Sequence, residues 1–302
     1  MSDSNKPKIV ITGASGFLGH PLCALAKETW CVHAVFHYNK PQVEGIEAIS
    51  MNLTEENEFQ DFLRTLAPQA VIHAAANANV SDCHAHPDNA EVINVRVPAH
   101  LSRVCKQLDI PMLFTSTDQV FDGLNAPYDE NSPPKPLGIY GKQKARAETE
   151  VLRYYPGALV CRLPLMFGLA PYTEDNFTVQ MLVSIAQNRP LNLFVDEYRT
   201  PVDNYSAARG ILQVLGRAHG LLHLGGKTRL SRYEMGLLMA KSMQVEPRLI
   251  RPMPVRKAGL AFKRALDCSL SSQRAYALGY DPTPVSAAIQ KTVDYYLDCK
   301  GK

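Results

Sequence analysis

The hydrophobic positions of the chain fall into short apolar runs separated by longer stretches in which apolar and polar residues alternate with helical spacing. The first run is rich in β-branched residues and ends in glycines, which is typical of a buried parallel strand. Similar runs predict strands at residues 8–12, 32–36, 70–74, 112–116 and 158–163. The stretches between them predict helices at residues 19–29, 55–66, 90–108 and 140–154.

Strands that alternate with helices of this length predict right-handed crossovers and a parallel sheet covered on both faces. The alternation weakens after residue 163, although residues 221–224 indicate one more strand of the main sheet. We therefore expect an α/β protein with two parts. Residues 1–163 would form the layered domain, with a returning segment near residues 200–226, and residues 164–302 would form mainly a smaller lobe over the sheet edge.

The composition narrows the class of protein. Hydrophobic residues make up 46% of the 302 positions and charged residues 20%, so the chain is expected to be globular. A net charge of +3 is too balanced to indicate nucleic acid or an anionic membrane as a partner. Neither a signal peptide nor an apolar run of membrane-spanning length is recognisable, and the cysteines are scattered. These features predict a cytoplasmic protein with reduced thiols.

Three glycines follow the first predicted strand and open the first predicted helix. Gly13, Gly16 and Gly19 are spaced Gly-x-x-Gly-x-x-Gly. A pyrophosphate has to approach the free N–H groups of a helix N-terminus closely, and side chains at the first two positions would block it. A side chain at the third would push the helix off the strand. In this context the loop predicts a dinucleotide-binding site.

The end of the second predicted strand bears on the choice of dinucleotide. An acidic residue there would favour NAD through the adenosine ribose, but the chain has no carboxylate before Glu44. His37 and Lys40 could instead meet a 2′-phosphate, which favours NADP and leaves NAD open. Asn52 and Leu53, after the next strand-like run, are expected to flank the adenine.

Tyr140 and Lys144 lie four residues apart on a predicted helix, so both face the same side. A nearby ammonium, together with an oxidised nicotinamide, would lower the pKa of the tyrosine and make it useful in proton transfer. Thr117, at the end of a predicted strand, would orient a substrate oxygen. Ser116 is the alternative, because strand alternation lets only one of the two face the site.

These motifs together resemble the extended short-chain dehydrogenase/reductase family, and within it the branch of dTDP-4-dehydrorhamnose reductases. The resemblance covers essentially the whole chain and is strongest up to residue 168. The residues that carry it are the loop at positions 12–19, the alanines at 74–76, Asn94-Val95, and positions 116–123, 127–128 and 140–144.

The resemblance implies a Rossmann-type doubly wound sheet with a small C-terminal substrate-binding lobe. It also implies an NADPH-dependent reduction of a nucleotide-linked 4-keto sugar, with Thr117, Tyr140 and Lys144 as catalytic residues. The cofactor-binding residues that it implies beyond the glycines and Tyr140–Lys144 are Ser15, Phe17, Leu18, Ala74, Ala75, Ala76 and Asn94.

The substrate side of the chain departs from the rhamnose-forming branch. Gln119 stands where a tyrosine is usual, and Arg232 stands where a tryptophan is expected. The sequence Arg199-Thr200-Pro201 replaces the Gly-x-Pro-Thr signature of that branch. Gln119 and Arg199 are candidate substrate residues; Arg199 could clamp a diphosphate or pair with Asp196 or Asp203. Residues 231–235 resemble instead the regulatory β subunit of methionine adenosyltransferases.

Three further points stay open at this stage. A non-catalytic NADP-binding partner protein is one alternative function, and a nucleotide-sugar epimerase or dehydratase is another. The pair His84-x-His86 has no third ligand nearby, so no metal site is expected. The helices at residues 90–108 and 140–154 could pair across a homodimer.

Overall fold

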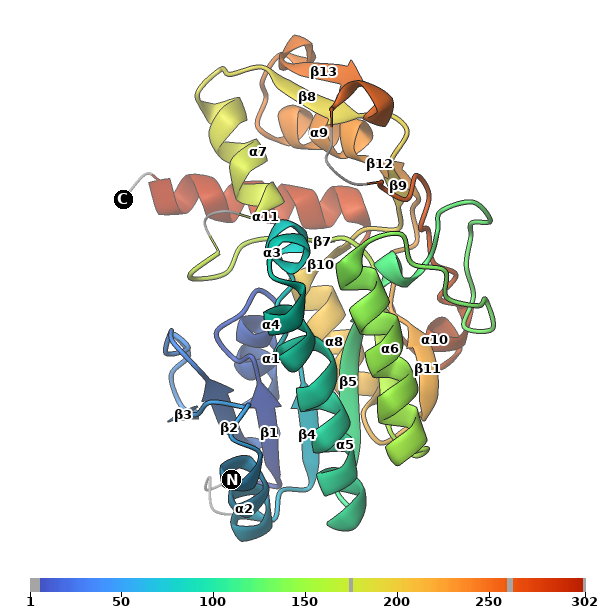
Figure 1. Ribbon diagram of the computed structural model, residues 1–302. Helices are drawn as coiled ribbons and strands as arrows, with labels where there is room; N and C mark the ends of the chain where they lie inside the picture. The colour runs from blue at the N-terminus through green and yellow to red at the C-terminus, as the bar shows by residue number, and fades with distance from the viewer. Residues whose placement is uncertain (1–5, 174–175, 260–262, 301–302) are drawn as a thin grey trace.

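A seven-stranded sheet runs through the centre of the molecule in the order β11-β6-β5-β4-β1-β2-β3 (Figure 1). The structure is a computed structural model, and it describes residues 6–173, 176–259 and 263–300. All neighbouring strands in this sheet are parallel. The strands are β1 (Lys8–Thr12), β2 (Cys31–Phe36), β3 (Glu47–Ser50), β4 (Ala70–His73), β5 (Met112–Thr117), β6 (Leu159–Leu163) and β11 (Gly220–His223).

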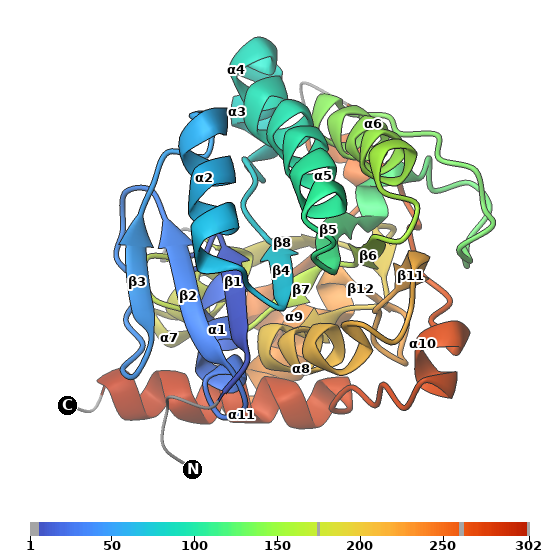
Figure 2. The same ribbon diagram turned by 90° about the horizontal axis from the view of Figure 1, so that it is seen from below.

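Helices cover both faces of this sheet, as Figure 2 shows from below. One face carries α2 (Glu56–Leu66), α5 (Val97–Gln107) and α6 (Ile139–Tyr154). The other carries α1 (Gly19–Ala26) and α8 (Asn204–Val214), and α11 (Val285–Lys300) lies beyond these two. The expected doubly wound α/β fold is therefore confirmed, and the strand order reverses between β1 and β4, where such sheets bind ligands.

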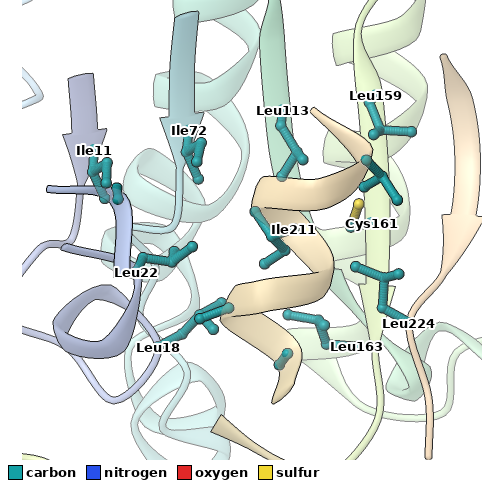
Figure 3. Packing of buried hydrophobic residues seen from close by; sticks show 14 of the residues in the cluster. Ile11, Leu18, Leu22, Ile72, Leu113, Leu159, Cys161, Leu163, Ile211 and Leu224 are labelled. Atoms are coloured by element: carbon teal, nitrogen blue, oxygen red, sulfur yellow. The ribbon is translucent and has the colours of Figure 1, made fainter. Parts of the chain in front are cut away.

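Apolar side chains pack in the layer between the sheet and α1 and α8 (Figure 3). Ile11, Ile72 and Leu113 project from three strands onto Leu22 of α1 and Ile211 of α8, and all five side chains are inaccessible to solvent. A second apolar cluster fills the opposite layer beneath α2, α5 and α6. These two layers fix the carboxyl ends of the strands, where the polar residues of the candidate site lie.

A smaller lobe stands above the carboxyl ends of the strands (Figure 1). It has its own apolar cluster, and a capping box of Ser231 and Glu234 begins its central helix. Its elements are α7 (Phe177–Ala186), β8 (Leu191–Phe194), α9 (Arg232–Ser242), η4 (Pro247–Leu249), β13 (Ile250–Met253) and η5 (Val255–Lys257).

Short elements join the two parts. Two strand pairs cross between them, β7 (Met166–Phe167) with β10 (Val202–Asp203) and β9 (Tyr198–Arg199) with β12 (Leu230–Ser231). The returning segment supplies α8 and β11 to the layers of the main sheet, and the boundary between two domains stays a prediction. The other short helices are α3 (Val80–Ala85), α4 (Pro87–Glu91), η3 (Asp118–Val120) and α10 (Gln273–Ala277).

The helix expected over residues 90–108 is not one regular helix. It is divided into α4, a π-helical turn η2 (Val92–Arg96), and α5. A π-turn widens the helix by one residue and often marks a functional position. Here it contains Asn94, whose side chain turns into the protein interior. In the part of the chain that the structure describes, no helix is long and apolar enough to cross a membrane.

Candidate functional site

The glycine loop connects β1 to α1 through very close backbone packing. Gly13 has φ +67°, and a Cβ atom on it would lie 2.7 Å from the backbone nitrogen of Ala75. A Cβ atom on Gly19 would strike the carbonyl oxygen of Gly13. The N–H of Gly16 donates to that same oxygen at 2.9 Å. Gly13 therefore requires glycine for the turn, and Gly19 requires it for the helix–strand contact, as the spacing predicted for Gly19. The approach of a pyrophosphate to Gly13 and Gly16 stays a prediction.

A cavity of about 360 Å³ opens beside this loop, at the reversal of the strand order. Its walls come from the ends of β1, β2 and β4, and no acidic side chain is among the described residues that line it. Predicted cofactor residues that line it are Gly13, Ser15, Gly16, His37, Asn52, Leu53, Ala74, Ala75 and Ala76. The cavity thus has the glycine cradle, apolar walls and absence of carboxylates that fit a dinucleotide phosphate.

The remaining predicted cofactor residues lie outside this wall. Phe17 contributes its carbonyl oxygen to a hydrogen bond from Asn204, at 3.2 Å. Leu18 is packed in the apolar layer, and Lys40 is exposed in the loop after β2. Sequence reasoning missed other wall residues, namely Tyr38, Asn39, Met51, Asn77 and Ile93. Tyr38 could have been noticed, because an exposed aromatic residue beside His37 offers a ring to a base; its ring centre lies 4.0 Å from that of His37.

Asn94 holds the loop after β4 rather than lining the cavity. Its Oδ1 accepts from the backbone N–H of Asn77 at 2.9 Å, and its Nδ2 donates to the carbonyl oxygen of Asn77 at 3.0 Å. The same Nδ2 donates to Gln143 of α6 at 2.9 Å. A buried amide with these three bonds ties the cavity wall to α6. Its position near the site agrees with the resemblance, and a direct contact with a cofactor stays a prediction.

Helix α6 brings Tyr140 next to the end of β5. The helix lies so close to the residues after β5 that a Cβ atom on Gly141 would strike the carbonyl oxygen of Gln119. Tyr140 is 8% exposed and Thr117 7% exposed. A hydrogen bond from Thr117 acts on the phenol of Tyr140 and works to lower its pKa. The two predicted catalytic residues are therefore neighbours in the structure.

The pKa of Tyr140 shifts in the direction opposite to the expected one. Burial raises it well above its usual value, and the negative charge of Asp118 raises it further. Lys144 is not among the causes of this shift; its ammonium donates to the carbonyl oxygen of Thr115 at 2.7 Å and lies 3.9 Å from the ring centre of Phe114. That Lys144 and an oxidised nicotinamide together lower the pKa of Tyr140 stays a prediction.

Lys144 is 2% exposed, and its burial lowers the pKa of its ammonium group to about 7. The carboxylate of Glu148 works in the other direction. Ser116 donates to this carboxylate, which also forms a buried ion pair with Arg162 at 2.7 Å. Ser116 therefore faces away from Tyr140, and Thr117 is the hydroxyl that faces it, as strand alternation requires.

A second, smaller cavity of about 170 Å³ lies on the substrate side. Gln119 and Arg199, the two predicted substrate residues, both line it. Arg199 is 6% exposed, and its Nε atom lies 3.1 Å from Asp118. The Nη2 atom of Arg199 lies 3.5 Å from the carboxylate of Glu197. The expected partners Asp196 and Asp203 are wrong, because β9 directs Arg199 towards the end of β5.

The loop after β4 contains the two histidines considered as metal ligands. His86 Nδ1 lies 2.9 Å from the carboxylate of Asp82, which an amide of Asn77 also contacts. Within residues 6–173, 176–259 and 263–300, no group of three or more histidine, cysteine, aspartate or glutamate side chains is arranged to hold a metal ion. Contacts among its own side chains, from His86 and Asn77 to Asp82, hold this loop.

Comparisons with known proteins agree on one family. Residues 7–297 match the model of the RmlD substrate binding domain. The chain is 28% identical over 296 residues to "Methionine adenosyltransferase 2 subunit beta" of Danio rerio, covering 95% of this chain and 90% of that protein.

Solved structures give the same result. A hypothetical dTDP-4-dehydrorhamnose reductase from Sulfolobus tokodaii is 29% identical, with a TM-score of 0.81 and coverage of 89% of this chain and 94% of that one. A dTDP-4-dehydrorhamnose reductase from Bacillus anthracis, solved with NADP, shares the fold at 20% identity, with a TM-score of 0.83 and coverage of 95% and 98%.

Proposed function

Because this chain belongs to the family of the RmlD substrate binding domain, we propose that it is an NADP-dependent reductase of a nucleotide-linked keto sugar. The observation that carries the proposal is the hydrogen bond between the hydroxyls of Thr117 and Tyr140 at the end of β5, with Lys144 one turn further along α6. A buried tyrosine hydroxyl needs a hydrogen-bond partner, and here the partner is a second hydroxyl that could also bind the oxygen of a substrate. A tyrosine that donates a proton needs such neighbours.

The glycine-loop cavity is the cofactor site in this proposal. The backbone N–H groups around Gly13 and Gly16 hold the pyrophosphate, and Asn52 and Leu53 flank the adenine. His37 and the absence of a lining carboxylate favour the 2′-phosphate of NADP over the free hydroxyl of NAD. When bound there, the reduced nicotinamide supplies a hydride to a carbonyl carbon.

The residues of the chain supply the proton and the orientation. Tyr140 has a raised pKa, so its hydroxyl is protonated at neutral pH and can donate to the oxygen of the substrate as negative charge develops on it. Thr117 offers a second hydroxyl to that oxygen and orients it. Lys144 occupies the same face of α6, and in this proposal it would contact the ribose next to the nicotinamide.

The proposal is tested by following NADPH oxidation with dTDP-4-dehydro-6-deoxy-L-mannose as substrate. We expect turnover with the wild type and none with Tyr140→Phe, while NADPH affinity measured by calorimetry is almost unchanged. The conservative change removes only the hydroxyl, so it leaves the cavity wall intact. Turnover retained in Tyr140→Phe would contradict the mechanism.

A non-catalytic partner subunit is the second candidate. The observation that favours it is the 28% identity to a methionine adenosyltransferase β subunit over nearly the whole chain. Such a subunit would bind NADPH without consuming it and would form a complex with a methionine adenosyltransferase. Comigration of the two proteins in gel filtration, with no turnover of any keto sugar, would support this candidate over the reductase. The homodimer expected from α5 and α6 stays a prediction, which the same column tests.

A further inference from the structure

The smaller cavity beside the catalytic residues has an unusual concentration of positive charge. Its cationic residues come from three separate parts of the chain: β9, the start of α9, and the segment before residue 267. They are Arg199, Arg232, Lys263 and Arg264. Four positive charges around a cavity of about 170 Å³ raise the free energy of the folded state unless anions compensate them.

Two carboxylates of the protein compensate part of this charge. Asp118 pairs with Arg199, and Glu197, which has an inaccessible side chain, lies between three arginines. Its oxygen is 2.9 Å from Arg264 and 3.5 Å from Arg232. Among the described residues, four cations thus face two carboxylates, which leaves an excess of two positive charges.

The cations differ in how much of their hydrogen-bonding capacity is already used. Arg199 is committed to the protein, because it also donates to the carbonyl oxygens of Tyr198, Ala265 and Leu266. Arg232 lies with its guanidinium carbon 4.1 Å from the ring centre of Phe177, and only its Nε approaches Glu197. Its two terminal nitrogens form no hydrogen bond with the described residues, and the exposed Lys263 has no ion-pair partner among them.

The location of the cavity indicates what it can hold. Its wall contains Gln119 and Gly138, each two residues from Thr117 or Tyr140. A group bound in it is therefore carried close to the reacting carbonyl. Its volume lies below the roughly 300–1,000 Å³ typical of complete ligand sites, so it accommodates one chemical group of a substrate.

We propose that Arg232 and Lys263 bind a single oxyanionic group, phosphoryl or carboxylate, that the substrate carries next to its reacting carbonyl. Arg232 is then a specificity-determining residue, because the tryptophan expected at this position offers an anion one neutral N–H donor and no positive charge. This inference rests on the proposed function, since it names a part of the substrate of that reductase. It extends the search beyond keto sugars that are neutral around the ketone to those with an acidic group near it.

The test is calorimetric titration of the NADPH-saturated protein with inorganic phosphate, acetate and pyrophosphate at constant ionic strength. Saturating NADPH keeps the probes out of the glycine loop, and constant ionic strength removes general screening. The variants are Arg232→Gln and Lys263→Gln, with Arg248→Gln as a control that removes the same charge from an exposed position outside the cavity. Lys263→Gln keeps the test valid if Arg232→Gln does not fold, because an exposed lysine without a partner adds little to stability.

We expect the wild type and Arg248→Gln to bind phosphate or acetate alike, and Arg232→Gln to bind about tenfold more weakly. A preference between phosphate and acetate identifies the group. The absence of saturable binding, or equal binding by Arg232→Gln and the wild type, would overturn the inference, as would binding of pyrophosphate alone. The heat does not depend on turnover, so anion binding without reduction of any keto sugar would refute only the proposed function.

Discussion

Gly141→Ala is a sharp test of how α6 positions the catalytic tyrosine. Gly141 has an ordinary helical conformation, so alanine is permitted by its backbone. In a free helix this change is favourable by about 1 kcal/mol. Here the added Cβ atom would strike the carbonyl oxygen of Gln119 and lie 3.0 Å from its carbonyl carbon. The obstacle is backbone, which cannot rotate away as a side chain can.

The two effects have opposite signs, and the clash is expected to win. Overpacking typically costs about 1–3 kcal/mol, so the net loss is about 0–2 kcal/mol after the gain in helix propensity, and a clash with backbone atoms places it towards the upper end. The larger effect is expected on catalysis. Relief of the clash moves α6, and with it Tyr140, by on the order of 1 Å, which can cost roughly a hundredfold in turnover.

The assay compares thermal unfolding and turnover of the wild type and Gly141→Ala. For stability the control is Gly138→Ala, because a Cβ atom there meets nothing within 4 Å. The melting temperature should fall by about 2–4 °C per kcal/mol in Gly141→Ala and stay nearly constant in the control. If Gly141→Ala is as stable as the wild type and turns over normally, the close approach of α6 to Gln119 does not position Tyr140.

Other predictions follow from the buried charges. Glu148→Gln leaves Arg162 without its buried partner and should cost about 3–5 kcal/mol in urea unfolding, whereas Glu150→Gln, in an exposed pair, should cost less than about 1 kcal/mol. Equal losses would show that the Arg162 pair is not buried in solution. Burial lowers the pKa of His73 and of His223 to about 3, so the unfolded chain binds protons below about pH 6.5 that the folded chain does not. As the pH falls below about 6.5, the free energy of unfolding should decrease by about 1.4 kcal/mol per pH unit for each histidine. His73→Gln should show a shallower decrease than the wild type.

The features that sequence reasoning predicted correctly depend on local patterns. The run before Gly13 is short, apolar and β-branched, which favours a buried strand, and added Cβ atoms on Gly13 and Gly19 would clash with backbone. The four-residue spacing of Tyr140 and Lys144 places both on one face of a helix whatever the rest of the chain does. Alternation along β5 likewise separates Ser116 from Thr117.

The features that it missed depend on contacts between distant segments. The π-turn at Asn94 is fixed by hydrogen bonds to Asn77 and Gln143, which no helix propensity encodes. Arg199 pairs with Asp118, and the choice between this partner and Asp196 is made by the pairing of β9 with β12. Such choices become visible only when the strands are assembled, because each alternative partner is an acceptable carboxylate in sequence.

The electrostatics of Tyr140 bear on the direction of the reaction. A tyrosine that starts an oxidation must first lose its proton, and a raised pKa opposes this loss. A tyrosine that completes a reduction must keep its proton until the substrate oxygen becomes negative, and a raised pKa favours this. Burial and Asp118 both raise the pKa of Tyr140. Burial also lowers the pKa of Lys144 to about 7, which reduces the positive charge that would oppose this shift. Burial and Asp118 therefore keep the phenol protonated. In the proposed reductase this protonation state suits Tyr140 to give a proton to the substrate oxygen as negative charge develops on it, and the excess positive charge at Arg232 would attract an anionic substrate to the neighbouring cavity.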